Sequence, residues 1–282
     1  MVQKAVILAR GLGTRMRERQ EWAKDGVRLS PEAEAIADKG IKAMVPIRGR
    51  PFLDYIIQRL LHAHFTELCL VIGPHDEHAI IRHYCERNLQ PRLPQGVALR
   101  FAVQEQAIGT ANAVLAAQEV VGEEEFVVIN GDNLYPEAAL RALREASPSG
   151  CYTVAYHREH LVARSNFEPE RVARFAVMEI EPAGQTLLRI IEKPDRPELF
   201  LHNGVVWVSM NCFRFTPAIF EACQRIGPSP RGEYELPDAV QYLIDRGVPF
   251  RVLFSHEGVL DLTRRHDIAT VEDFLQDWRW DF

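Results

Sequence analysis

The sequence has few cysteines, no dominant charge and no long apolar run. Its five cysteines are odd in number and widely spaced, which argues against a disulfide framework and against a zinc knuckle. Nowhere does it contain the run of about 18 apolar residues that a membrane-crossing helix needs. A net charge of −6 leaves no sequence-wide basic field for nucleic acid. We therefore expect a soluble protein that requires neither a membrane nor nucleic acid as a partner.

The first apolar stretch begins at Ala5, and this position leaves no room for a signal peptide ahead of it. We therefore expect the protein to be cytoplasmic. Three histidines, His75, His78 and His83, fall on one predicted helix. They have neither cysteine partners nor the HExxH spacing of a zinc site, so we predict that they lie on a solvated helix surface.

The stretch that organises the chain is an apolar strand that runs into a glycine turn. Residues 5–9 are continuously apolar, as in a strand buried on both faces of a parallel sheet. Gly11 and Gly13 then allow a sharp turn whose backbone N–H groups can approach an anion. Arg15 adds a planar cationic fork that suits phosphate oxygens. This stretch predicts a phosphate-binding loop.

Two other phosphate-binding loops are excluded by the sequence itself. No lysine followed by Ser or Thr comes after Gly13, as a P-loop requires. A dinucleotide fingerprint needs Gly or Ala where Met16 stands, and an acidic residue at the end of the next strand, which instead ends at Gly73. The loop therefore indicates neither an ATP-hydrolysing motor nor a dehydrogenase.

Strands and helices alternate over the first 150 residues, which is typical of βαβ units and a mostly parallel sheet. We predict helix 51–65, strand 67–73, helix 76–88, strand 97–104, helix 110–121 and strand 126–130. The pattern then changes to strands 151–157, 174–181, 187–192, 205–215 and 250–254, with helices 217–226, 236–246 and 266–278. The fold class is therefore α/β, a Rossmann-like mostly parallel sheet flanked by helices, with mixed or antiparallel strands added in the second half.

A charged segment, residues 16–40, interrupts this alternation. Ser30 is a suitable N-cap for a short helix that begins at Pro31. The apolar residues of the segment, Trp22, Val27, Leu29 and Ile36, are sparse for a buried face. We predict a lid-like insertion that covers the ligand or contacts a neighbouring subunit instead of joining the core.

Polar residues follow two of the predicted strands. Asp132 comes directly after strand 126–130, where open α/β sheets bind ligands, and Gly131 leaves room for a metal or phosphate. Gln104 ends another strand; its amide can pair with a base edge, and N–H groups near Gly109 can bind a second edge. Each signal alone also fits an ordinary turn cap or helix start. Together they predict a nucleotide site.

The order of these motifs resembles one family, the sugar-1-phosphate nucleotidyltransferases, which act on glucose 1-phosphate or mannose 1-phosphate. The resemblance covers nearly the whole chain. It includes Leu-Ala-Arg-Gly-Leu-Gly-Thr-Arg at residues 8–15, Lys42 to Pro46, Gln104 with Gly109, Gly131-Asp132, Glu192-Lys193-Pro194, residues 208–211, residues 232–238, and Leu260-Asp261. The chain departs from the family pattern at Arg10, which replaces a small residue, at Ile41, and in the length of the segment before Lys42.

The resemblance implies a single domain over residues 1–282, with a nucleotide-binding half at 1–150 and a sugar-phosphate-binding half at 151–282. It implies a catalytic set of Arg15, Lys42 and Lys193, and a nucleotide-binding set of Ala9, Arg10, Gly11, Gly13, Thr14, Arg15, Gln104, Gly109 and Thr110. Glu192, Lys193, Ser209 and Asn211 would bind the sugar phosphate, and Asp132 and Asp261 would bind Mg²⁺.

The implied reaction joins a nucleoside triphosphate and a sugar 1-phosphate to give an NDP-sugar and pyrophosphate. A cyclitol 1-phosphate is a further possible substrate, and a homo-oligomer is a possible assembly. Two alternatives remain open: a non-catalytic homologue or regulatory subunit that senses nucleotide or sugar, and a glycosyltransferase. The sensor would be favoured by loss of Arg15, Lys42 or Asp132, and all three are present. A glycosyltransferase would be expected to carry a metal-binding Asp-x-Asp motif.

Overall fold

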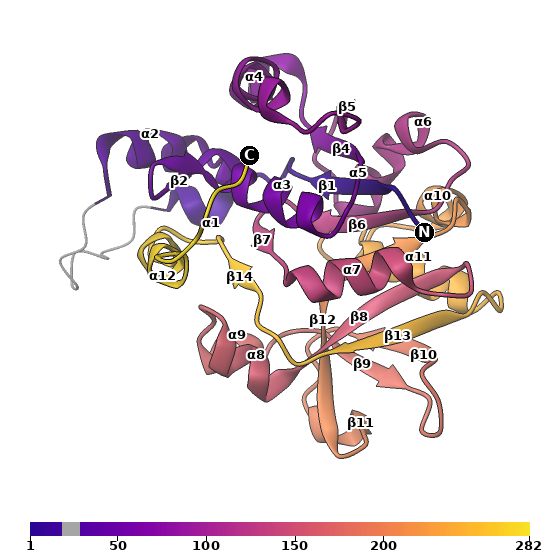
Figure 1. Ribbon diagram of the computed structural model, residues 1–282. Coiled ribbons are helices and arrows are strands. Elements are labelled where there is room, and N and C mark those ends of the chain that lie inside the picture. Colours follow the sequence, from indigo (N-terminus) through magenta and orange to yellow (C-terminus); the bar gives the residue numbers. More distant parts are fainter. Residues whose placement is uncertain (19–28) are drawn as a thin grey trace.

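The computed structural model describes residues 1–18 and 29–282 and is built around a single ten-stranded sheet (Figure 1). The strands run in the order β10-β9-β12-β6-β1-β4-β5, and β8, β11 and β13 join through β12 and β8. Their bounds are β1 Lys4–Leu8, β4 Glu67–Ile72, β5 Ala98–Val103, β6 Phe126–Asn130, β8 Cys151–His157, β9 Val177–Ile180, β10 Leu187–Ile191, β11 Leu201–His202, β12 Val205–Phe215 and β13 Phe250–Ser255.

The first half of the chain supplies the parallel part of this sheet. Strand β1 pairs in parallel with β4 and β6, and β4 pairs in parallel with β5. Because side chains alternate along a strand, Ala5 and Ile7 pack into one hydrophobic core while Val6 packs into a second core on the other face. Burial on both faces explains the continuous apolar run, and the predicted parallel sheet is confirmed.

The second half adds the mixed strands that were predicted. Strand β12 is antiparallel to both β6 and β8, whereas β13 runs parallel to β8. Strands β9 and β10 form the expected antiparallel hairpin. Since β12 bonds directly to β6, strands of both halves belong to one sheet.

Helices cover both faces of the sheet. Helices α3 and α7 contribute to the first core and lie together in front of the sheet in Figure 1, whereas α5, α10 and α11 contribute to the second core. The helix bounds are α1 Thr14–Arg17, α2 Pro31–Lys39, α3 Phe52–His62, α4 His75–Tyr84, α5 Thr110–Ala116, α6 Gln118–Val121, α7 Glu137–Glu145, α8 Arg158–Arg164, α9 Pro169–Val172, α10 Ala218–Arg225, α11 Leu236–Ile244 and α12 Asp267–Phe274.

Several short elements escaped the sequence prediction. Two-residue strands form the pairs β2 (Pro46–Ile47) with β3 (Arg50–Pro51) and β7 (Asn133–Leu134) with β14 (Leu260–Asp261). Helices α7, α8 and α9 were also not predicted. The two-residue strands and the four-residue α9 are too short to show a hydrophobic period, so only the folded chain reveals them. Helix α7 has nine residues and one buried face, and its period was overlooked.

The expectation that segment 16–40 stays outside the core is wrong for its described part. Ser30 caps α2 as predicted, with its Oγ accepting from Ala33 N at 3.2 Å. Ile36 and Ala37 on that helix are buried in the first core, as is Met16 from α1. The few apolar side chains are enough because α2 is short and buries one narrow face. Residues 19–28, including Trp22 and Val27, lie outside the described residues.

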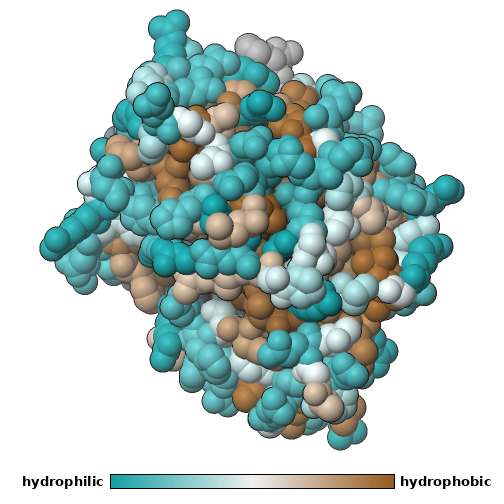
Figure 2. Space-filling model, turned by 45° about the vertical axis from the view of Figure 1, so that its right-hand side comes forward, coloured by the Kyte–Doolittle hydropathy of each residue, from teal (hydrophilic) through white to brown (hydrophobic). Residues whose placement is uncertain are grey.

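The surface combines hydrophilic and hydrophobic side chains. Hydrophilic side chains dominate the face in Figure 2, with hydrophobic ones in separate patches between them. Within the two described ranges, no helix combines the length and apolarity that crossing a membrane requires. The prediction that His78 is solvated is wrong: the residue is buried, and its Nδ1 accepts a hydrogen bond from Gly73 N at 2.7 Å, which satisfies a ring nitrogen removed from water.

Candidate active site

Two adjoining cavities, of about 360 and 640 Å³, lie along the sheet and share Arg15, Thr110 and Asn130 in their walls. The smaller cavity is lined by the predicted nucleotide-binding residues together with Lys42 and Asp132: Ala9, Arg10, Gly11, Gly13, Thr14, Arg15, Gln104, Gly109 and Thr110. The larger is lined by the predicted sugar-side residues Glu192, Lys193, Ser209 and Asn211, and by Asp261. Side chains from the whole length of the chain therefore meet at one continuous cleft.

The glycine turn after β1 forms the wall of the smaller cavity. It is anchored on both sides, because Ala9 N donates to Val71 O at 2.9 Å and Gly131 N donates to Leu8 O at 2.8 Å. Gly13 has a φ of 62°, and a Cβ there would lie 2.1 Å from Gly40 O at the end of α2. Only glycine permits this close approach, so the end of α2 sets the shape of the turn.

The turn is tied to the loop that follows β5. Arg10 is buried, and its Nη2 donates to Glu105 O at 3.2 Å. Gln104 braces the same loop, with Nε2 donating to Gly109 O at 3.0 Å and to Asn112 Oδ1 at 2.9 Å. The large Arg10 is therefore accommodated by a backbone contact across the cavity.

Gly109 and Thr110 connect this loop to the segment before α11. Gly109 has a φ of 123°, and a Cβ there would lie 2.4 Å from Tyr234 O. Thr110 Oγ1 accepts a hydrogen bond from Leu236 N at 2.9 Å. Through these contacts both residues hold the loop after β5 against the segment before α11. This packing explains why residues so distant in sequence line one wall of the cavity.

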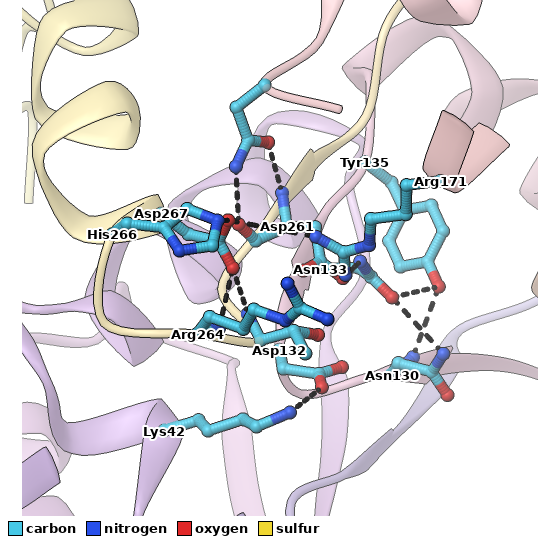
Figure 3. Close-up of polar contacts among 12 residues, drawn as sticks. Lys42, Asn130, Asp132, Asn133, Tyr135, Arg171, Asp261, Arg264, His266 and Asp267 are labelled. Carbon is cyan, nitrogen blue, oxygen red and sulfur yellow. Dashed lines mark hydrogen bonds and ion pairs between the residues drawn. The ribbon is translucent and has the colours of Figure 1, made fainter. Parts of the chain in front are cut away.

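Lys42 and Asp132 form an ion pair within the smaller cavity. Asp132 follows β6, and Lys42 begins a short 3₁₀ turn, Lys42–Met44. The Lys42 Nζ lies 2.8 Å from Asp132 Oδ2 (Figure 3). Gly131 is needed beside them because a Cβ would lie 2.8 Å from Leu8 O. Lysine and carboxylate therefore lie side by side on one wall of the space that a ligand would enter.

Asp261 is brought to Asp132 by the pairing of β7 with β14. In that pair Asp261 lies opposite Asn133, whose Nδ2 donates to Asp261 Oδ2 at 2.9 Å. Leu262 N also donates to Asp132 O at 2.9 Å. Asn166 fixes the Asp261 backbone from a third segment, since its Nδ2 and Oδ1 bond Asp261 O and N, each at 2.8 Å. Two carboxylates far apart in sequence thus lie together.

The Asp261 carboxylate is buried and depends on a cation that the sequence did not reveal. Arg171 Nη2 donates to Asp261 Oδ1 at 2.5 Å, and Figure 3 shows its side chain directed at that carboxylate. Burial raises the pKa of Asp261, and the neighbouring Asp132 raises it further, while Arg171 and Lys42 oppose the rise. The carboxylate pair is therefore charge-balanced by two cations from outside its own strands.

The sugar-side residues lie around the larger cavity. Lys193 and Asn211 adopt positive φ values of 43° and 52°, which are uncommon for residues with a side chain. Ser209 Oγ accepts from Asn211 N at 3.3 Å and stabilises that bend. The surrounding protein raises the pKa of Glu192 by desolvation, although its side chain is open to the cleft.

Other residues of the larger cavity were not found by sequence reasoning. They include Asn130, Asn133, Asn166, Arg171, Arg174, Arg231, Arg264, His266 and Asp267. Asn130 and Asn133 flank Gly131-Asp132, and Arg231 precedes the segment 232–238, so proximity to a motif could have indicated these three. Arg171 and Asn166 lie in a stretch without any motif, and only the contacts to Asp261 identify them.

The family model described as Nucleotidyl transferase matches residues 25–277. A low-salt glycan biosynthesis nucleotidyltransferase of Haloferax volcanii is 28% identical to this chain over 244 residues, which cover 86% of this chain and 58% of that protein. A UTP–glucose-1-phosphate uridylyltransferase of the same organism is 28% identical over 277 residues, which cover 97% of this chain and 97% of that protein. The chain thus spans about half the length of the first relative and nearly all of the second.

A solved structure has the same fold. The crystal structure of a UDP-glucose pyrophosphorylase complexed with UDP-glucose superposes with a TM-score of 0.72, at 18% identity, over 99% of this chain and 100% of the other. The likeness extends over both halves of the sheet.

Proposed function

Because the chain belongs to the nucleotidyl transferase family, we propose that it joins a nucleoside triphosphate to a sugar 1-phosphate, forming an NDP-sugar and releasing pyrophosphate. The observation that carries this proposal is the pair of adjoining cavities, which share Arg15 and meet near Asp132 and Asp261. Two substrates that must react with each other need two sites with a common border. Relatives named for uridylyl and thymidylyl transfer to glucose 1-phosphate support the substrate class.

The chemistry requires positioning and charge neutralisation more than proton transfer. A phosphate oxygen of the sugar 1-phosphate attacks the α-phosphorus in line, and the bond to pyrophosphate breaks. The attacking group is already an anion, so a general base is unnecessary. Arg15 would hold the triphosphate and the departing pyrophosphate, Lys42 the phosphates at the reacting centre, and Lys193 the sugar phosphate.

Asp132 and Asp261 have the chemistry of a Mg²⁺ site. They are hard oxygen donors held together by the β7–β14 pair, and two cations, Lys42 and Arg171, already balance their charge. When bound, Mg²⁺ would neutralise charge on the α-phosphate. Lys42 and Arg171 would then be released from the carboxylates and become available to phosphate oxygens.

The larger cavity suits a polar, hydroxylated ligand. Glu192 would accept hydrogen bonds from sugar hydroxyls, and Ser209 and Asn211 would contribute further polar groups from the bend in β12. The raised pKa of Glu192 reflects desolvation that hydroxyl donors would offset. The smaller cavity would select the base, and the larger cavity would select the sugar.

A substrate matrix tests the proposal. The protein is incubated with Mg²⁺, each of the four nucleoside triphosphates plus dTTP, and several sugar or cyclitol 1-phosphates, while pyrophosphate release is followed. We expect release that requires both substrates. Triphosphate binding without turnover across the whole matrix would contradict catalysis and favour the sensing homologue.

A further inference from the structure

Three histidines gather outside the proposed active site, each from a different segment. His157 ends β8, His160 lies in the first turn of α8, and His256 directly follows β13. Their ring centroids are 4.1 Å apart for His157 and His160, 5.3 Å for His157 and His256, and 5.1 Å for His160 and His256. One nitrogen from each ring lies within 4.8 Å of the other two. None of the three lines either cavity of the proposed active site.

The nitrogen positions resemble those of metal ligands. Nδ1 of His256 lies 3.2 Å from Nδ1 of His160. A tetrahedral zinc ion with bonds of about 2.0–2.1 Å to imidazole separates two ligand nitrogens by about 3.3 Å. These two rings are therefore already at ligand-to-ligand spacing, and the third ring offers a nitrogen within 4.8 Å of both, so it would have to move closer when a metal binds.

The environment of His157 favours the neutral imidazole, the form that binds metal. Burial lowers the pKa of His157, and the neighbouring His160 and His256 lower it further. Neutral imidazole is the ligand form, so less proton competition is expected at neutral pH. Trp207 packs against the rings of His157 and His256 at 5.5 and 5.4 Å and limits their movement.

We propose that His157, His160 and His256 form a binding site for one divalent transition-metal ion of the zinc class. Three imidazoles favour Zn²⁺, Co²⁺, Ni²⁺ or Cu²⁺ over Mg²⁺ and Ca²⁺, which prefer oxygen ligands. The His256 side chain is exposed, so the fourth position faces solvent. This site is separate from Asp132 and Asp261 in both residues and ligand chemistry.

A metal here would link α8 to the chain between β13 and β14, the two segments whose contacts position Asp261. Arg164 Nη1 donates to His256 O at 2.8 Å, and Val259 N donates to Ser165 Oγ at 3.0 Å. Asn166 then bonds both backbone polar groups of Asp261. The ion would add a third kind of bond between α8 and the chain from β13 to β14, and we infer that it stabilises the position of Asp261 from a distance.

The test uses the full chain, freed of metal and then titrated with Co²⁺ in excess Mg²⁺, which occupies carboxylate sites. A tetrahedral Co²⁺ complex absorbs visible light strongly, whereas a six-coordinate oxygen site absorbs weakly. We expect one strongly absorbing Co²⁺ per chain, displaced by Zn²⁺, and a rise in melting temperature with Zn²⁺. H256Q should weaken Co²⁺ binding by more than about 100-fold, because losing even a hydrogen-bond partner of a ligand costs about 10–100-fold.

H83Q is the matched control, since His83 is an exposed histidine on α4 away from the cluster, and it should bind Co²⁺ as the unaltered chain does. H160Q is a second loss variant, and circular dichroism verifies that each variant is folded. A weak, six-coordinate spectrum in the unaltered chain would overturn the proposal. So would a strong spectrum that persists in both H256Q and H160Q.

Discussion

Lys42 donates a hydrogen bond of 2.8 Å from Nζ to Oδ2 of Asp132, joining two cavity-lining residues that lie 90 positions apart in sequence. The pair holds a carboxylate and a cation ready on one cavity wall. When substrates and a cation bind, Asp132 would contact the cation and Lys42 would contact a phosphate, in place of each other. Each member can therefore be tested by removing its charge alone.

Asp132→Asn should reduce turnover by at least about 100-fold, because an amide is a poor Mg²⁺ ligand and electrostatic groups at a reacting centre contribute on this scale. The side chain keeps its shape and is partly exposed, so the fold should persist. Steady-state pyrophosphate release and circular dichroism measure the two effects. Asp273→Asn, at an exposed position on α12, is the control. A normal rate in Asp132→Asn would remove this residue from the metal site.

Lys42→Met should lower kcat by about 100–1,000-fold and weaken triphosphate binding, since the lysine would no longer neutralise phosphate charge. Melting should change little, because the ion pair is partly open to solvent and such pairs contribute about 0–1 kcal/mol. Kinetics and calorimetric titration with triphosphate give the two values. Lys39→Met, on the exposed end of α2, provides the comparison. Equal kinetics in the two variants would exclude Lys42 from catalysis.

Much of the fold was predictable because its signals are local. The apolar run around Val6 indicates a strand buried on both faces, and the parallel neighbours follow from the alternation of strands and helices. The burial of Met16 and Ile36 was not predictable, because it depends on α2 docking against the nucleotide turn near Gly40. Sparse apolar residues can be buried when another element supplies the surface.

The residues of the site were likewise predictable only where their signal is local in the sequence. Asp132 was indicated by its own strand, whereas Asp261 was assigned only through family resemblance, since a two-residue strand has no period. Arg171 could not be predicted, because its importance comes from contacts to two carboxylates, Asp261 and Asp267, that lie 90 or more positions later. The His157 cluster likewise combines three segments whose meeting requires the folded sheet.

Arg171→Met should destabilise the metal-free protein by about 3–5 kcal/mol, because it leaves the buried Asp261 carboxylate without its cation. Adding Asp261→Asn in the same chain should recover much of this loss, since the uncompensated charge is then gone. Urea unfolding in EDTA of both single variants and the double variant measures the coupling. Additive effects would show that the two side chains do not depend on each other.

Glu125→Gln should destabilise the protein at pH 7 by about 1–3 kcal/mol, because Arg214 is buried and donates to this carboxylate through Nε at 3.0 Å. Burial acts to raise the pKa of Glu125, but hydrogen bonds from Ser149 and Arg214 outweigh it and the pKa is lowered. The stabilisation is therefore complete above the ordinary pKa of about 4.3 and is lost as pH falls through the lowered value.

Urea unfolding of Glu125→Gln and of the unaltered chain should consequently converge as the pH is lowered from 7 towards 3. Glu123→Gln, at an exposed neighbouring position, should show no such pH-dependent difference. A gap between Glu125→Gln and the unaltered chain that stays constant over this range would mean that the carboxylate's charge is not what stabilises Arg214.

Gly13→Ala should destabilise the protein by at least about 1–2 kcal/mol, the strain of placing a side chain in the left-handed region. The added Cβ would also lie 2.1 Å from Gly40 O, so α2 and the nucleotide turn must move apart. Gly11→Ala is a close control, because a Cβ at Gly11 meets nothing within 4 Å in the same turn. We expect Gly11→Ala to melt like the unaltered chain, and Gly13→Ala to melt lower and to bind triphosphate more weakly. Equal melting of the two variants would show that α2 is not docked on the turn, and would restore the view that the segment up to Gly40 lies outside the core.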